Sequence, residues 1–201
     1  MNKTLVAAVS AAAILAGAFS TSAMAAREGG DWIFRAGMTN VDPKQVADSD
    51  LNLTIDDDTA VSLTGVYMFT DGFGIELLAS TPFEHDFSVD GVQVGSTKHL
   101  PPTLNLQYYF NAAGEFHPYV GAGINYTTFF STKSAIDGLK LDDSFGYDVQ
   151  AGVDFEISER LLLNLDVRWI KIESDVKVDG DKIGTAKIDP MTVGINLGWK
   201  F

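Results

Sequence analysis

Apolar and polar residues alternate along most of the chain after residue 25, in eight segments that turn residues separate. A period of two is typical of β-strands with one apolar face, and no stretch after residue 25 is apolar for long enough to be a transmembrane helix. The apolar positions of these segments carry neither charges nor amides. They fall within residues 32–38, 61–69, 73–79, 104–110, 120–126, 145–155, 161–169 and 191–201. The pattern predicts eight β-strands.

The positions between the apolar ones carry glycine, serine, threonine, amides and charges, so the two faces of each predicted strand differ sharply. Alternation alone does not tell which face meets water, and a soluble eight-stranded barrel is the alternative. Small and amide residues suit a narrow lumen, and aromatic residues gather near one set of turns, as they do at a membrane interface. We therefore predict that the polar face lies inside a barrel and that the apolar face contacts lipid.

The connections between the predicted strands alternate between short and long. The short ones are residues 70–72, 111–117 and 158–160, and the long ones are residues 41–59, 82–102, 131–143 and 173–190. Short periplasmic turns and long extracellular loops are typical of outer-membrane barrels, and an even number of strands closes the sheet without edges. The predicted fold is all-β, an eight-stranded antiparallel transmembrane β-barrel with both ends of the barrel domain on the short-turn side.

The first 25 residues have the pattern of a secretory signal peptide. A short basic start is followed by a small apolar run over residues 5–19, and residues 20–25 end in an Ala-x-Ala pattern. The apolar run is short for a membrane anchor, which is the alternative. We predict cleavage after Ala25, a barrel domain over residues 26–201, and location in the bacterial outer membrane.

Composition removes several classes of function. Acidic residues outnumber basic ones by 27 to 14, for a net charge of −13, which argues against a nucleic-acid partner. The absence of cysteine removes disulfides, zinc–thiolate sites and iron–sulfur clusters, and only three histidines are present, so we expect no cofactor. His85 and Asp86 are adjacent and would point to opposite faces of a strand, so we predict that the protein is not an enzyme.

Seven charged residues occupy lumen-facing positions of the predicted strands. They are Arg35, Glu76, Asp148, Asp154, Asp166, Arg168 and Lys200. An eight-stranded barrel is only just wide enough for its side chains or for one small ligand. Because a buried unpaired charge is costly, we favour a packed ionic network over the alternative that these residues confer ion selectivity.

A second set of lumen and loop positions is apolar or aromatic. It comprises Val66, Met68, Leu78, Tyr109 and Leu162 in the strands, and Phe83 and Leu100 in a long connection. Leu78 precedes that connection, where apolar loop residues would meet the lumen. These seven residues form a candidate path for a hydrophobic ligand, and the alternative is that the loop residues only fill their own loop.

Three segments resemble the OmpW family of Gram-negative outer-membrane proteins: residues 76–85, residues 100–104 and residues 118–130. The resemblance implies a narrow eight-stranded barrel that is proposed to pass small hydrophobic molecules. Trp199 and Phe201 resemble the aromatic-ended assembly signal that the barrel-assembly machinery reads. Family members often carry an aromatic residue on the lumen side of the seventh strand, where this chain has Arg168.

Two functions remain open from the sequence. The first is transport of small hydrophobic molecules through a narrow channel. The second is a plugged structural or receptor barrel whose extracellular loops bind phage, bacteriocin or host partners. The expected partners are outer-membrane lipid and lipopolysaccharide, the barrel-assembly machinery and a small hydrophobic ligand. A cluster of acidic residues in the first long connection is predicted to be a solvated loop, since it lacks the spacing of a calcium-binding loop.

Overall fold

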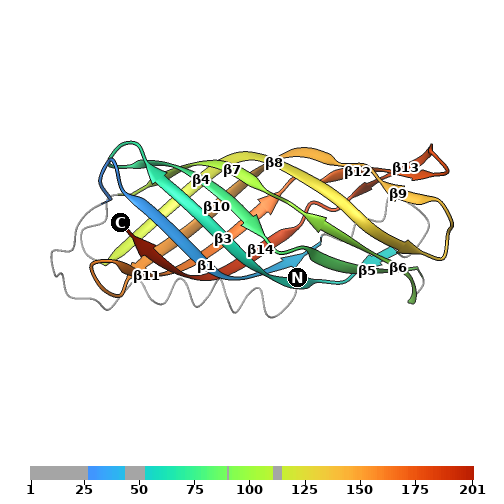
Figure 1. The fold of residues 1–201 in the computed structure, drawn as a ribbon, viewed down its shortest axis with the longest axis horizontal. Helices are drawn as coiled ribbons and strands as arrows, with labels where there is room; N and C mark the ends of the chain where they lie inside the picture. The colour runs from blue at the N-terminus through green and yellow to red at the C-terminus, as the bar shows by residue number, and fades with distance from the viewer. Residues whose placement is uncertain (1–26, 44–52, 90, 111–114) are drawn as a thin grey trace.

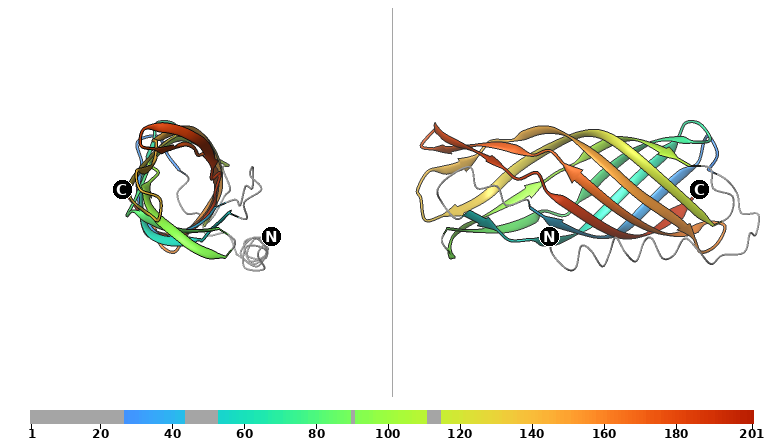
Figure 2. Two further views of the ribbon diagram at one scale, coloured as in Figure 1. Left: turned by 90° about the vertical axis from the view of Figure 1, so that its right-hand side faces the viewer. Right: turned by 180° about the vertical axis from the view of Figure 1, so that it is seen from behind.

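The computed structural model describes residues 27–43, 53–89, 91–110 and 115–201, and the predicted signal peptide lies outside them. Eight antiparallel strands form a closed barrel, seen from the side in Figure 1 and along its axis in Figure 2. Pairing of the first barrel strand with the last, and of the fifth with the sixth, completes the ring. The barrel strands are β1 (Trp32–Asp42), β3 (Asp58–Met68), β4 (Phe73–Ser80), β7 (Thr103–Tyr109), β8 (Phe116–Ser134), β10 (Ser144–Glu156), β11 (Leu161–Ile170) and β14 (Met191–Lys200). No helix in the described ranges is long and apolar enough to cross a membrane.

The two faces of the barrel confirm the predicted assignment. Leu63, Leu77 and Leu197 point outward and are each more than half exposed, whereas the residues that alternate with them face the lumen and are buried. Aromatic residues meet on the outer surface near the short turns, where Phe73 contacts both Phe69 and Tyr108. An apolar outer band with an aromatic girdle is the surface that a lipid bilayer solvates.

The long connections are richer in strand than the sequence predicts. They contain β2 (Leu53–Ile55), β5 (Phe83–Val89), β6 (Val92–Leu100), β9 (Leu139–Leu141), β12 (Glu173–Val178) and β13 (Asp181–Lys187). In the β12–β13 hairpin, Asp179 and Gly180 both have positive φ, as a two-residue hairpin turn requires. These strands extend the barrel wall beyond the membrane, at the end where β5, β6, β9, β12 and β13 gather in Figure 1.

Candidate functional site

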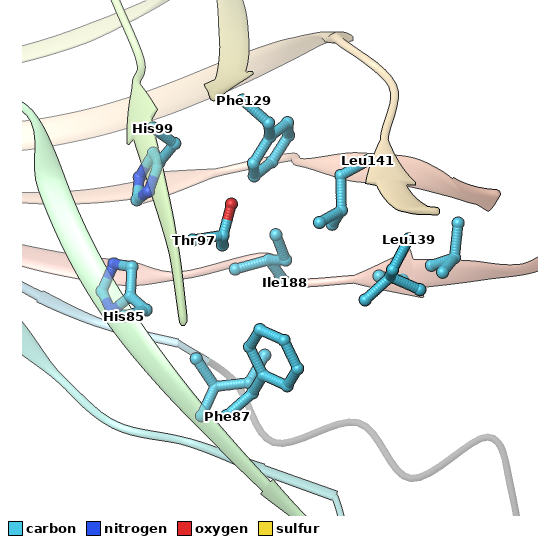
Figure 3. A pocket seen from close by; sticks show the side chains of 11 residues that line it. His85, Phe87, Thr97, His99, Phe129, Leu139, Leu141 and Ile188 are labelled. Atoms are coloured by element: carbon cyan, nitrogen blue, oxygen red, sulfur yellow. The ribbon is translucent and has the colours of Figure 1, made fainter. Parts of the chain in front are cut away.

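An apolar pocket lies at the extracellular end, between two groups of strands (Figure 3). One wall comes from β2, β5, β6 and β8, and the other from β9, β12, β13 and the residue that follows β13. The cavity has a volume of about 180 Å³, and we call it the vestibule. Its lining residues are Ile55, His85, Phe87, Thr97, His99, Phe129, Leu139, Leu141, Val176, Ala186 and Ile188.

Four stacked or tilted rings lie at the inner end of the vestibule. His99 is at the centre, with its ring centroid 5.4 Å from that of Phe83, 5.0 Å from that of His85 and 5.8 Å from that of Phe129. Strand pairing sets this contact, because His99 on β6 is registered with Phe83 on β5 and with Phe129 on β8. The rings give the vestibule an aromatic floor.

Both histidines of this floor are buried, and burial makes the His99 ring neutral. Burial lowers the pKa of His99 to about 3, with the neighbouring His85 as a second cause, so His99 is uncharged at neutral pH. The Nδ1 atom of His85 lies 2.7 Å from the main-chain carbonyl oxygen of Asp56. Because a carbonyl oxygen only accepts, His85 Nδ1 carries the proton of this hydrogen bond.

A second, smaller cavity lies below the aromatic floor. Its volume is about 20 Å³, which is enough for one water molecule, and it is lined by Leu78, Phe83, Pro101 and Ile170 among others. His99 lines both cavities, so its ring separates the vestibule from the lumen below.

The barrel wall is interrupted beside this lower cavity. The β4–β7 ladder ends at the pair Leu78 and Thr103, and the β5–β6 ladder starts at Phe83 and His99. No ladder pair joins residues 79–82 to residues 100–102, all of which the structure describes. Proline has no N–H to donate, and three of these seven positions are proline. We call this interruption the wall window.

A charged plug crosses the lumen further down. Glu76 on β4 accepts hydrogen bonds from Arg168 Nη1 at 2.7 Å and from Arg35 Nη1 at 3.2 Å, and all three residues are buried. Strands β4 and β11 lie on opposite sides of the eight-stranded ring, so the contact between Glu76 and Arg168 spans the lumen. Arg35 also binds Asp154 at 2.7 Å, and Arg168 binds Asp166 at 2.9 Å. The plug blocks a straight path along the barrel axis.

An apolar layer and a second charge cluster close the barrel below the plug. The layer consists of Ile33, Val66, Met68, Tyr109, Tyr119 and Leu162. Next to it, Arg27 forms ion pairs with Asp154 at 2.9 Å and with Glu156 at 3.3 Å. Lys200 and His117 each approach Glu156 to 3.3 Å. The periplasmic half of the lumen is therefore filled with side chains, as expected for a barrel of this size.

The structure divides the seven residues of the predicted ligand path between two levels. Leu78 and Phe83 line the small cavity above the plug. The other strand residues of the predicted path belong to the apolar layer below the plug, and these are Val66, Met68, Tyr109 and Leu162. Leu100 is half-buried, in the wall window. Parity along a strand indicates that a side chain faces the lumen, but it does not give the height of that side chain in the barrel.

Among the described residues, six of the seven predicted network residues take part in ion pairs, and Asp148 does not. The sequence did not point to Arg27, Glu156 or His117 as members of the charge clusters. Glu156 lies two residues after Asp154 on β10 and therefore faces the lumen as well. This alternation could have predicted it from the sequence. Arg27 precedes the first strand and lies 129 residues from Glu156 in the chain, so no local pattern reveals their contact.

The predicted assembly signal lies at the short-turn end of the barrel. Trp199 and Phe201 are exposed on the outer surface with their ring centroids 6.4 Å apart, and the Phe201 ring also contacts that of Phe34. The role of these residues in assembly stays a prediction. Among the described residues, no group of three or more His, Asp or Glu side chains is placed to hold a metal ion.

Comparison with known proteins agrees with this architecture. The model of the OmpW family matches residues 28–201. The chain belongs to the OmpW family. It is 41% identical over 210 residues to outer membrane protein W of Vibrio cholerae serotype O1, a match that covers 94% of this chain and 96% of that protein. This OmpW-family barrel is therefore an outer-membrane protein.

A solved structure and a more distant relative extend the comparison. The crystal structure of the outer membrane protein OprG from Pseudomonas aeruginosa matches with a TM-score of 0.75 and 34% identity, over 87% of this chain and 97% of that one. The dibenzothiophene metabolism operon protein PahQ of Pseudomonas aeruginosa is 25% identical over 186 residues, which cover 85% of this chain and 88% of that protein. The OprG match places the OmpW-family barrel among outer-membrane barrels.

Proposed function

We propose that this barrel binds small hydrophobic molecules in its vestibule and passes them into the outer membrane. The observation that carries the proposal is an apolar cavity of about 180 Å³ at the extracellular end. An engineered apolar cavity of about 150 Å³ in another protein binds benzene, so the vestibule has room for a molecule of one aromatic ring. No chemical step is part of the proposal.

The route that the geometry supports leaves the lumen sideways, above the plug. His99 borders both cavities, and the lower cavity reaches Ser80 and Pro101 at the wall window. A molecule that displaced the His99 ring and widened the lower cavity, which now has room for one water molecule, would meet a gap in the strand pairing instead of the charged plug. Apolar ligands gain nothing from the plug, whose charges are already paired, but they gain contacts in the lipid outside.

The name of one relative supports a hydrophobic substrate. PahQ is named for an operon of dibenzothiophene metabolism, and dibenzothiophene is an apolar aromatic compound. The competing function is a plugged receptor barrel whose extracellular hairpins bind a macromolecule. The vestibule favours the small-molecule function, because a receptor surface does not require an apolar cavity.

Binding can be tested by methyl NMR of the barrel in lipid nanodiscs, with toluene as the probe. We expect toluene to shift the methyl signals of Leu139, Leu141 and Ile188 in the vestibule. The methyl signals of Ile195 provide the control, because this side chain faces lipid. Equal shifts at both places would reflect toluene dissolved in the lipid and would contradict the proposed site.

Passage can be tested with a variant that leaves the vestibule intact. Leu78→Asp places a charge in the lower cavity and should slow the uptake of labelled toluene by cells with an intact outer membrane. The expected loss is on the order of tenfold, the equivalent of ~1.4 kcal/mol of apolar contact. Val92→Asp is the matched control, because Val92 is exposed on the extracellular hairpin and lines neither cavity.

The same assay separates the two functions. A receptor barrel predicts that wild-type cells take up toluene no faster than cells without the protein. Normal uptake by Leu78→Asp, together with toluene binding in the vestibule, would contradict the sideways route but not the binding site.

A further inference from the structure

A broad groove lies on the outer surface of the barrel, over strands β11, β14, β1, β3 and β4. It has a volume of about 640 Å³, and we call it the outer groove. Its outward-facing side chains are all aromatic or aliphatic, and it shares no lining residue with the vestibule or with the lower cavity. The outer groove is therefore a separate feature of the lipid-facing wall.

The register of four neighbouring strands explains the shape of this groove. Ala36 on β1 is registered with Leu197 on β14 and with Leu63 on β3, and Leu63 is in turn registered with Ala79 on β4. Registered side chains share one face of the sheet and lie about 4.5–5.5 Å apart at their Cβ atoms. Large and small residues thus alternate across the wall, which leaves a notch over Ala36 and another over Ala79.

The depth of the groove in the membrane matches that of an acyl chain. Leu63 and Leu197, which border the notches, are each more than half exposed and belong to the apolar band. Trp32 and Trp199 line the end of the groove that is nearest the short turns. Because tryptophan is enriched at the level of the lipid headgroups, this end lies at headgroup depth and the two notches lie deeper, among the hydrocarbon chains.

A basic side chain adjoins the headgroup end of the groove. Leu161 lines the groove, and Arg160 directly precedes it. The main-chain oxygen of Arg160 accepts a hydrogen bond from Lys200 N at 2.8 Å, which places Arg160 next to the end of β14. Arg160 is exposed, and no ion pair joins it to any residue that the structure describes. A guanidinium group in this position is suited to a phosphate, which it can bind through two N–H groups.

We propose that the outer groove binds a phospholipid of the periplasmic leaflet, with one acyl chain in the notches over Ala36 and Ala79 and the phosphate at Arg160. The chain gains apolar contact on both sides of Leu63, and the headgroup gains a charged partner at the depth where it already lies. The site is independent of ligand binding in the vestibule.

The test measures how brominated acyl chains quench tryptophan fluorescence after the barrel has folded into vesicles of phosphatidylcholine and brominated phosphatidylglycerol. The chain has three tryptophans, and Trp169 lies on β11 outside the groove. Trp169→Phe therefore reports on the groove, and Trp32→Phe combined with Trp199→Phe reports on ordinary lipid contact at Trp169. We expect the groove reporter to be half-quenched at an about fivefold lower fraction of phosphatidylglycerol, the equivalent of about 1 kcal/mol for one basic group facing an anionic lipid.

Substitutions in the Trp169→Phe background separate the two parts of the site. Ala36→Leu fills one notch and Arg160→Gln removes the basic group, and each should abolish the preference. Ala122→Leu is the matched control, because Ala122 is exposed on β8 outside the groove, so the preference should remain. If Ala36→Leu does not fold, Ala79→Leu fills the other notch and takes its place.

Three results would overturn the proposal. Equal half-quenching fractions at the two reporters would mean that lipid contacts the groove no differently from the rest of the wall. A preference that Arg160→Gln removes but Ala36→Leu leaves would mean that charge attracts the lipid and that no chain occupies the notch. A preference that Ala122→Leu also removes would reflect the whole lipid-facing surface instead of this groove.

Discussion

The vestibule above Leu78 is lined mostly by aromatic and aliphatic side chains, whereas below Leu78 charged side chains pair across the lumen above a smaller apolar layer. The upper region is carried by hairpins that extend from the barrel, and the lower region by all eight barrel strands. Non-directional apolar contacts tolerate ligands of different shape, but a buried ion pair tolerates no loss of its partner. Under the proposed function, the upper region would adapt to a ligand, while the ion pairs of the lower region hold the barrel closed.

The largest expected effect on stability comes from removing the carboxylate at the centre of the plug. Glu76→Gln leaves Arg35 and Arg168 without the carboxylate that both contact, so we expect the free energy of unfolding to fall by about 3–5 kcal/mol. Urea titration of the folded band in detergent measures this change. Glu159→Gln, in an exposed short turn, is the control and should change stability by less than about 0.5 kcal/mol. A small effect of Glu76→Gln would show that the lower region is not held by its charges.

A second test compares the outer surfaces of the two regions. Ile195 on β14 faces lipid, and Ile183 on β13 is equally exposed but lies on the extracellular hairpin. We expect Ile195→Arg to destabilise the barrel by about 2–4 kcal/mol, and Ile183→Arg to have little effect because water solvates its charge. Folding yields into vesicles measure both variants. Equal yields would contradict the position of the membrane on the barrel.

The sequence predicts the lower region well because one rule governs it. Within the membrane every outward residue must be apolar, so alternation such as that of Leu104 and Leu106 with Asn105 and Gln107 identifies both the strand and its buried face. The same alternation predicts that the lumen is charged. The alternation does not predict which charged residues pair, because this depends on which strands lie opposite each other. Glu76 and Arg168, for example, are 92 residues apart in the chain.

The upper region is harder to predict because the inner face of its β5–β6 hairpin mixes histidine and threonine with phenylalanine, so the alternation of apolar and polar residues is weaker. The vestibule floor depends on a register shift between Phe87 and Ser88. Without the shift, Lys98 would be registered with Phe83, and the shift brings His99 to that position instead. No residue pattern signals the shift, so the sequence could supply the two histidines but not their contact.

Acidity provides a third test, which acts on the upper region. His99 has a pKa of about 3 in the closed vestibule and about 6.5 when solvated, so protons bind preferentially to the open state. The closed state should therefore lose stability as the pH falls from 6.5 to 3, by ~2 kcal/mol at about pH 5. Hydrogen exchange of the β5–β6 hairpin measures the opening. His99→Phe, with His85 intact, should remove most of this dependence, and an unchanged dependence would contradict the role of His99.

The smallest expected effect comes from an ion pair of the upper region. Lys98 on β6 and Glu84 on β5 are 3.4 Å apart, and both side chains are more than a third exposed. Their chemistry resembles that of the plug pairs, but water screens the attraction and competes for both groups. We expect a double-mutant cycle with Lys98→Ala and Glu84→Ala to give a coupling energy of about 0.2–1 kcal/mol, which high salt reduces further. A coupling as large as that between Arg168 and Glu76 would show that burial is not the reason why the plug pairs are strong.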